Sequence, residues 1–142
     1  MSRNAEPSPA QAAALLQAAR AVRRHAHAPY SRFKVGAAVL DEQGRVHAGC
    51  NVENAAYPQG LCAEAAAIAA LVAAGGKAVR AVAVVADSKV PTTPCGGCRQ
   101  RIAEFARDDC PVLVGTPRAL KLVTSLGALL PHGFGPPALR RR

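Results

Sequence analysis

The sequence lacks any long hydrophobic run, even though half of its 142 residues are apolar. No stretch is long and apolar enough to span a bilayer, and the N-terminus carries no apolar segment typical of a secretory signal. We therefore expect a cytoplasmic protein that has no membrane partner. The length predicts a single domain over residues 1–142, with flexible tails at 1–7 and 138–142.

Aromatic residues are also scarce, since they make up 4% of the chain and tryptophan is absent. A formal net charge of +9 would ordinarily suggest a nucleic-acid partner. However, no aromatic side chains are interleaved with the basic residues to stack on bases. The arginines at 140–142 form a terminal tail, and Arg20, Arg23 and Arg24 share one predicted helix end. We interpret most of this charge as solvated surface and do not expect nucleic acid as a partner.

The five cysteines are an odd number in a chain without a signal sequence, which argues against a disulfide framework. Cys50 and Cys110 are interpreted as small buried hydrophobic residues. The alternative that Cys50 completes a structural zinc site of four cysteines stays open. The other three cysteines belong to two motifs that predict the chemistry.

These motifs are Cys62-Ala63-Glu64 and Pro94-Cys95-Gly96-Gly97-Cys98. Structural zinc sites use four protein ligands, whereas catalytic sites use three and keep a position for water. Zinc lowers the pKa of water towards neutrality, and Glu64 is placed to move protons between that water and a leaving amine. Cys-x-Glu followed by Pro-Cys-x-x-Cys matches the signature of zinc-dependent nucleobase deaminases. The motifs therefore predict hydrolytic deamination at one zinc ion per subunit.

The competing interpretation of the three cysteines is a purely structural zinc module. Such a site needs a fourth ligand and has no use for Glu64, so catalysis is the favoured interpretation.

Hydrophobic patterns predict alternating helices and strands. Ser8, Pro9 and Gln11 predict a capped helix that ends around residues 25–27. Residues 61–74 are apolar on every side, which predicts a fully buried helix, and a third helix follows Cys95 and ends at 108–109. Strands are predicted at 34–40, 45–52, 79–86, 112–114 and 120–123. The alternation predicts an α/β fold with helices on both faces of the sheet.

Six blocks of sequence make the chain resemble the cytidine deaminases of pyrimidine salvage, specifically the small homotetrameric type. The blocks lie between residues 29 and 136, and the resemblance extends over about residues 12–137. They are Pro29-Tyr30-Ser31-x-Phe33-x-Val35-Gly36-Ala37-Ala38, Asn51-Val52-Glu53-Asn54-Ala55, Tyr57-Pro58-x-Gly60-x-Cys62-Ala63-Glu64, Pro94-Cys95-Gly96-x-Cys98-Arg99-Gln100, Glu104-Phe105 and Leu129-Leu130-Pro131-x-x-Phe134-Gly135-Pro136.

The resemblance implies a three-layer α/β/α sandwich with a mixed, roughly five-stranded sheet. It also implies that cytidine and 2′-deoxycytidine are hydrolysed to uridine, 2′-deoxyuridine and ammonia. Zinc would be held by Cys62, Cys95 and Cys98, with Glu64 as the proton shuttle.

Substrate contacts are implied by the same resemblance. Phe33 would stack on the pyrimidine, Asn51 and Glu53 would hold the ribose, and Ala63 would also contact the substrate. Tyr57 and Phe134 would reach a neighbouring subunit's site, so that a homotetramer would share its active sites.

Ala65 departs from the pattern, because many members of this family carry arginine immediately after the catalytic glutamate. Zinc with three thiolates has a net negative charge, which weakens it as a Lewis acid unless positive charge is returned. Helix N-termini supply part of that charge, and Arg99 is a further candidate. Our hypothesis is that Ala65 leaves the site more electron-rich and less active.

Two other substrate classes compete with cytidine. Deaminases of RNA or DNA generally have histidine where this chain has Cys62, and Asn51 with Glu53 suits a free nucleoside better. A deaminase of a modified nucleoside or of a blasticidin-type compound shares the zinc motifs, but the block from Asn51 to Tyr57 is of the cytidine type.

Overall fold

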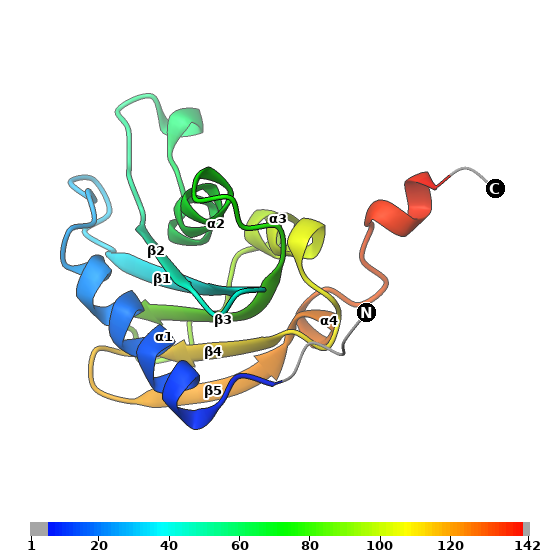
Figure 1. Cartoon of the computed structure of the whole chain (residues 1–142). Helices are drawn as coiled ribbons and strands as arrows, with labels where there is room; N and C mark the ends of the chain where they lie inside the picture. The colour runs from blue at the N-terminus through cyan, green and yellow to red at the C-terminus, as the bar shows by residue number, and fades with distance from the viewer. Residues whose placement is uncertain (1–5, 141–142) are drawn as a thin grey trace.

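The computed structural model describes residues 6–140. Four α-helices, five strands and two short 3₁₀ helices follow one another along this part of the chain (Figure 1). In chain order they are α1 (Pro9–Arg23), β1 (Val35–Asp41), β2 (Val46–Cys50), η1 (Tyr57–Gln59), α2 (Ala63–Ala73), β3 (Val79–Ala86), α3 (Gly96–Phe105), β4 (Pro111–Gly115), β5 (Leu120–Ser125), α4 (Leu126–Leu129) and η2 (Pro136–Leu139).

The five strands form one mixed sheet in the order β2-β1-β3-β4-β5. β1 runs antiparallel to both β2 and β3, β3 and β4 are parallel, and β5 returns antiparallel to β4. The parallel pair is joined through α3, which is the crossover that parallel strands require. The predicted mixed sheet of about five strands is therefore confirmed.

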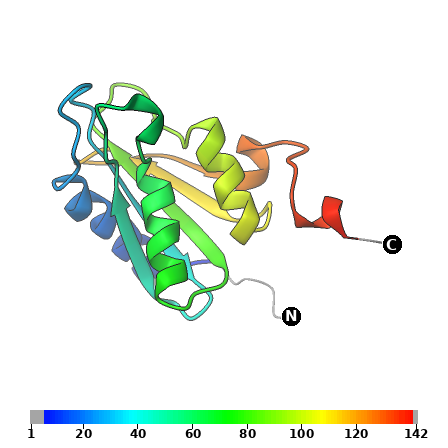
Figure 2. The same ribbon diagram turned by 90° about the horizontal axis from the view of Figure 1, so that it is seen from above.

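Helices cover both faces of this sheet, as Figures 1 and 2 show: α1 lies on one face, and α2 and α3 lie on the other. Successive strand residues point to opposite faces, so β1 contributes to two separate cores. Ala38 and Leu40 pack with Leu15 on the α1 side, while Ala37 and Val39 belong to the core beneath α2 and α3. This confirms the three-layer sandwich.

The first helix begins as predicted. The Ser8 hydroxyl accepts from the Gln11 N–H and the Gln11 side chain accepts from the Ser8 N–H, which is a capping box. The helix ends at Arg23, earlier than expected. The reason is that the His27 N–H donates to the Asn51 carbonyl, so this segment pairs with the chain beyond β2 and leaves the helix.

The prediction of a helix buried on every side at 61–74 is wrong for the single chain. Ala63, Ala67 and Leu71 face the core, but Val72 is 48% exposed and Ala69 and Ala73 are also exposed. Alanine and valine tolerate either environment at low cost, so the apolar composition alone did not reveal which face the sheet covers.

α2 approaches the sheet very closely at Gly49 in β2. A Cβ atom on Gly49 would lie 2.6 Å from the Ala66 Cβ and would overlap the backbone N of Ala67. The missing side chain therefore sets the distance between the sheet and the helix that begins beside Cys62.

Other boundaries differ by a few residues from the expectations. β2 ends at Cys50, so Asn51 follows the strand, and α3 ends at Phe105. The short elements η1 and α4 were not predicted. Of the expected tails, only residues 6–7 and 138–140 are described, and η2 includes Ala138 and Leu139. Over residues 6–140, none of the helices combines the length and apolar character needed to cross a bilayer.

Candidate metal centre and active site

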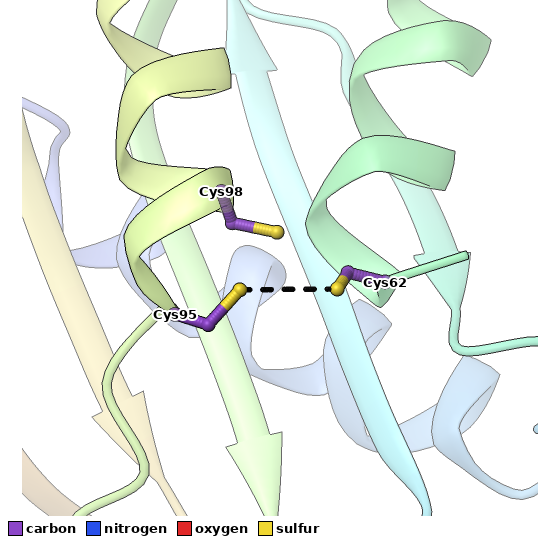
Figure 3. A group of neighbouring side chains, drawn as sticks. All are labelled: Cys62, Cys95 and Cys98. Atoms are coloured by element: carbon purple, nitrogen blue, oxygen red, sulfur yellow. Dashed lines mark hydrogen bonds between the residues drawn. The ribbon is translucent and has the colours of Figure 1, made fainter. Parts of the chain in front are cut away.

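The starts of two helices bring the three motif cysteines together. Cys62 is the N-cap residue of α2, Cys95 is the N-cap residue of α3, and Cys98 lies in the first turn of α3. Figure 3 shows their sulfur atoms pointing towards one another from the two helices. Positive helix N-termini favour thiolates at these positions.

The geometry of the three sulfur atoms fits zinc. All three lie within 4.8 Å of one another, and the Sγ atoms of Cys62 and Cys95 are 3.9 Å apart. A tetrahedral ion with Zn–S bonds of about 2.3 Å needs sulfur atoms about 3.8 Å apart. Soft thiolate ligands select zinc over calcium or magnesium.

The composition of this cluster gives the number of protein ligands that the metal would have. Within residues 6–140 it contains these three cysteines and no fourth His, Cys, Asp or Glu. Cys50 is not part of it and is partly exposed, so its predicted burial is wrong, whereas Cys110 is buried as predicted. A set of three ligands leaves a position for water, which is typical of a catalytic site.

The three thiols have different environments. Burial raises the pKa values of Cys62 and Cys98, and the nearby Glu64 carboxylate raises the pKa of Cys98 further. The backbone N–H of Cys98 donates to the Cys95 sulfur and lowers the pKa of Cys95. The pocket therefore needs a strong cation to hold all three as thiolates.

Glu64 is almost fully buried, with 5% of its surface exposed, beside the ligand sulfurs in the first turn of α2. Burial raises its pKa above the ordinary value of 4.5, while a hydrogen bond with Cys98 and the positive charge of Arg101 act in the opposite direction. A carboxyl group with a raised pKa can both take and give a proton near neutral pH.

A cavity of about 400 Å³ opens beside the cysteines. Its walls include Cys62, Cys95 and Glu64 together with four of the residues predicted to contact substrate: Phe33, Asn51, Glu53 and Ala63. Its size suits a small organic molecule. As the first residue of α2, Ala63 offers a backbone N–H that the helix leaves without an intrahelical acceptor.

Asn51 lies immediately after β2 and holds the segment that carries Phe33. Its Oδ1 accepts from the Val35 N–H at 2.8 Å, and its Nδ2 donates to the Phe33 carbonyl at 2.8 Å. An amide nitrogen carries two hydrogens, so one N–H remains for a ligand in the cavity.

Glu53 is oriented by the loop that precedes β1. The backbone N–H groups of Tyr30 and Ser31 donate to its Oε1 at 3.0 and 3.1 Å, and the Ser31 hydroxyl donates to its Oε2. These hydrogen bonds, led by those of Ser31, lower the pKa of Glu53. The carboxylate is therefore held ionised and fixed in direction.

Tyr57 and Phe134 do not line this cavity. Tyr57 is 76% exposed, stacks edge-on against Tyr30 with ring centres 5.9 Å apart, and lines an adjoining hollow that shares Glu53 and Gly60 with the main cavity. Phe134 is 59% exposed and is tied through its carbonyl to Gln100 Nε2 at 2.9 Å. Neither ring therefore lines the cavity that contains Cys62 and Cys95 of its own chain.

Two arginines take positions that the sequence did not predict. Arg99 donates to the carbonyls of Pro94 and Leu129 and to Thr93 Oγ1, so it stabilises the loop before Cys95 and does not contact a sulfur atom. Arg101 instead has its Nη1 4.0 Å from Cys98 Sγ. Helical spacing from Cys98 was the available signal for Arg101.

Comparison with known proteins agrees with this geometry. Residues 9–114 match a family model described as the cytidine and deoxycytidylate deaminase zinc-binding region. The chain belongs to this deaminase family. The resemblance identified from the six sequence blocks is thereby confirmed.

Individual members of the deaminase family are similar over most of their length. A cytidine deaminase of Sporosarcina psychrophila is 42% identical over 120 residues, covering 84% of this chain and 88% of the relative. A cytidine deaminase of Mycobacterium tuberculosis is 44% identical over 110 residues, covering 78% and 79% of the two chains. The crystal structure of cytidine deaminase from Burkholderia pseudomallei has a TM-score of 0.81 and 44% identity, over 86% of this chain and 98% of that one.

Proposed function

We propose that this protein is a zinc-dependent deaminase that hydrolyses cytidine and 2′-deoxycytidine to uridine and 2′-deoxyuridine and releases ammonia. The observation that carries the proposal is that buried Glu64 shares one cavity with the cysteine cluster and with Phe33, Asn51 and Glu53. Cytidine deaminases are also the relatives that match this chain over most of its length.

Zinc would be held by Cys62, Cys95 and Cys98, and when bound it lowers the pKa of water so that a nucleophile is available at neutral pH. Glu64 then manages the protons. It accepts one proton from the attacking water and passes it to N3 of the pyrimidine, then takes the proton of the new C4 hydroxyl and delivers it to the amine that leaves from C4. Its burial supports this role, because the raised pKa lets the carboxyl hold a proton more tightly than an ordinary glutamate does before passing it on.

The nucleoside would be oriented by the opposite wall of the cavity. Phe33 offers a flat ring for the pyrimidine, the free N–H of Asn51 can donate to a ribose hydroxyl, and ionised Glu53 can accept from one. A donor and an acceptor side by side suit a sugar hydroxyl, which both donates and accepts.

The assembly is part of the proposal. It comprises a single domain over residues 1–142, expected from the length, and one zinc ion per subunit, expected from the motifs. The homotetramer with shared sites is implied by the family resemblance. The exposed rings of Tyr57 and Phe134 and the exposed Val72 of α2 support the idea that a second subunit covers them. Pyrimidine salvage and a cytoplasmic location stay predictions from the sequence.

The first experiment measures ammonia release from cytidine and 2′-deoxycytidine by the zinc-loaded protein. Glu64→Gln should lose about 100- to 10,000-fold in kcat, since it cannot exchange protons, while keeping its zinc. Glu104→Gln, which changes an exposed carboxylate on α3, is the matched control and should keep wild-type turnover. If the zinc-loaded wild type leaves both nucleosides unchanged, the substrate assignment is wrong.

Shared active sites can be tested by subunit mixing. Phe134→Ala and Glu64→Gln homo-oligomers should each be weakly active, because one lacks the ring offered to the neighbour and the other lacks the proton shuttle. Hybrids formed by unfolding and refolding the two together should recover part of the activity. If the activity of the hybrids is no greater than the summed activities of the two variants measured separately, the site is not shared between subunits.

A further inference from the structure

With zinc bound, the site would carry an excess of negative charge. Three thiolates and one divalent ion would sum to −1, and the buried carboxyl of Glu64 lies beside the three cysteines. A net charge held partly away from water is costly unless an opposite charge lies near it. Ala65, the residue after Glu64, carries no charge, and the starts of α2 and α3 provide partial charges alone.

Arg101 places a full positive charge beside the sulfur atom of Cys98. It lies one turn after Cys98 on α3, and its Nη1 is 4.0 Å from Cys98 Sγ, at the long end of a hydrogen bond to sulfur. Residues three positions apart share a face of a helix, so the side chain reaches back over the ligand.

Gly97 leaves room for this guanidinium. A Cβ atom at position 97 would lie 3.2 Å from Arg101 Nη1, so a side chain there would push the tip of the arginine aside by a few tenths of an ångström. Gly97 therefore lets the guanidinium lie close to the backbone of α3.

The neighbouring Arg99 does not compete for this role. Its Nε, Nη1 and Nη2 donate at 2.7, 2.8 and 2.9 Å to Pro94 O, Leu129 O and Thr93 Oγ1. All three nitrogens have oxygen partners, so its charge is directed away from the sulfur atoms.

We propose that Arg101 is a positioning residue that compensates the charge of the three-thiolate zinc site and supplies the positive charge absent at Ala65. The inference rests on the proposed zinc centre. It also revises the hypothesis that Ala65 leaves the site electron-rich. The compensating positive charge is carried by Arg101 on α3, and not by a residue of α2.

The test is zinc affinity, measured by chelator competition at fixed pH and low salt. Arg101→Ala and Arg101→Gln should bind zinc about 3- to 10-fold more weakly than wild type, whereas Arg101→Lys should keep most of the affinity. The double variant Ala65→Arg/Arg101→Ala should recover the zinc affinity, because an arginine on α2 then supplies the positive charge that α3 has lost. Arg118→Ala removes one exposed charge far from the cysteines in sequence and should bind zinc as wild type does.

Cobalt provides a second readout that a merely structural role would not change. Removing a guanidinium from a thiolate makes the sulfur a better electron donor, so the sulfur-to-cobalt charge-transfer band of Arg101→Gln should move to lower energy. The band of Arg118→Ala should not move. The loss of affinity in Arg101→Ala should also shrink as salt increases, since the side chain is partly exposed.

The outcomes separate this inference from the proposed function. If wild type holds zinc and deaminates cytidine but Arg101→Ala binds zinc equally well, with an unmoved cobalt band, the role of Arg101 is wrong and the function stands. A wild-type protein that binds no zinc would overturn both.

Discussion

Asn51 is the residue where structural and substrate-binding roles meet most closely. Its side chain bonds to the backbone of both Phe33 and Val35 and also lines the cavity. Asn51→Ala should therefore lower the stability by about 1–3 kcal/mol, because partly buried backbone groups lose their partners. It should also raise KM for cytidine about tenfold, through the lost contact and the loosened Phe33.

The measurements are steady-state kinetics and denaturant unfolding. Asn54→Ala is the matched control, because the Asn54 side chain accepts from the Ala56 N–H in an exposed loop. A rise in KM of the same size in both variants would contradict the specific role of Asn51.

The sequence predicted single residues well where spacing along one helix decides the geometry. Cys95 and Cys98 had to share a side of α3, and the family resemblance paired them with Cys62, which the structure brings together. Arg101 was missed because the role of an arginine depends on where a long, flexible side chain turns. That direction depends on the space above Gly97, which residue types do not reveal.

At the level of elements, the contact between α2 and β2 should be sensitive to the size of one residue. Gly49→Ala would place its new methyl against the backbone of α2 at Ala66 and Ala67, which cannot rotate away. We expect the free energy of unfolding to fall by about 1–3 kcal/mol. The affinity for zinc should also fall, since α2 carries Cys62 at its start.

Thermal unfolding and chelator competition measure the two effects. Gly96→Ala is the control for stability, because nothing lies within 4 Å of its added Cβ. If Gly49→Ala is as stable as wild type, the prediction is wrong, because α2 can then move away from β2 without a cost in free energy.

Asp41, the last residue of β1, is a buried carboxylate that holds the turn to β2, and its effect on stability depends on pH. Burial alone would raise the pKa of Asp41, but hydrogen bonds from His47 and Arg45 and from backbone N–H groups bring it to about 2, below the ordinary 3.8. Because the folded pKa lies below the unfolded one, ionised Asp41 stabilises the protein above pH 3.8, and this contribution is lost as the pH falls towards 2.

Asp41→Asn should therefore be less stable than wild type by about 1–3 kcal/mol at neutral pH. The difference should narrow steadily below pH 4, because the Asp41 carboxyl of the unfolded chain binds a proton there while that of the folded chain stays ionised down to about pH 2. Urea unfolding from pH 7 to pH 2.5 measures it. A difference independent of pH would show that the charge of Asp41 is not what stabilises the turn.

Elements with strong patterns were predicted and weakly patterned ones were not. The five strands and the helices α1, α2 and α3 carry apolar periodicity, caps or a long apolar run, whereas η1, α4 and η2 span three or four residues each and offer almost no pattern. The exposed side of α2 was missed for a different reason. A run of alanines contains no polar residue to mark the uncovered face.

At the level of the whole molecule, the chain exposes apolar side chains on several elements. Val72 of α2, Tyr57 of η1, Phe134, and Leu139 of η2 are each between 48% and 76% exposed. In Figure 1 the C-terminal segment with η2 projects away from the sheet. An extended arm that buries little against its own chain is suited to packing on another subunit, in line with the proposed assembly.

The two hydrophobic cores have a consequence for how the enzyme is supplied with metal. Neither packed cluster of core residues includes Cys62, Cys95 or Cys98, so we expect the sandwich to fold without the ion. Cys62 and Cys95 lie at the starts of α2 and α3 and line the cavity, which leaves them within reach of an ion that arrives after folding. The folded, metal-free protein would then stay inactive until zinc is supplied.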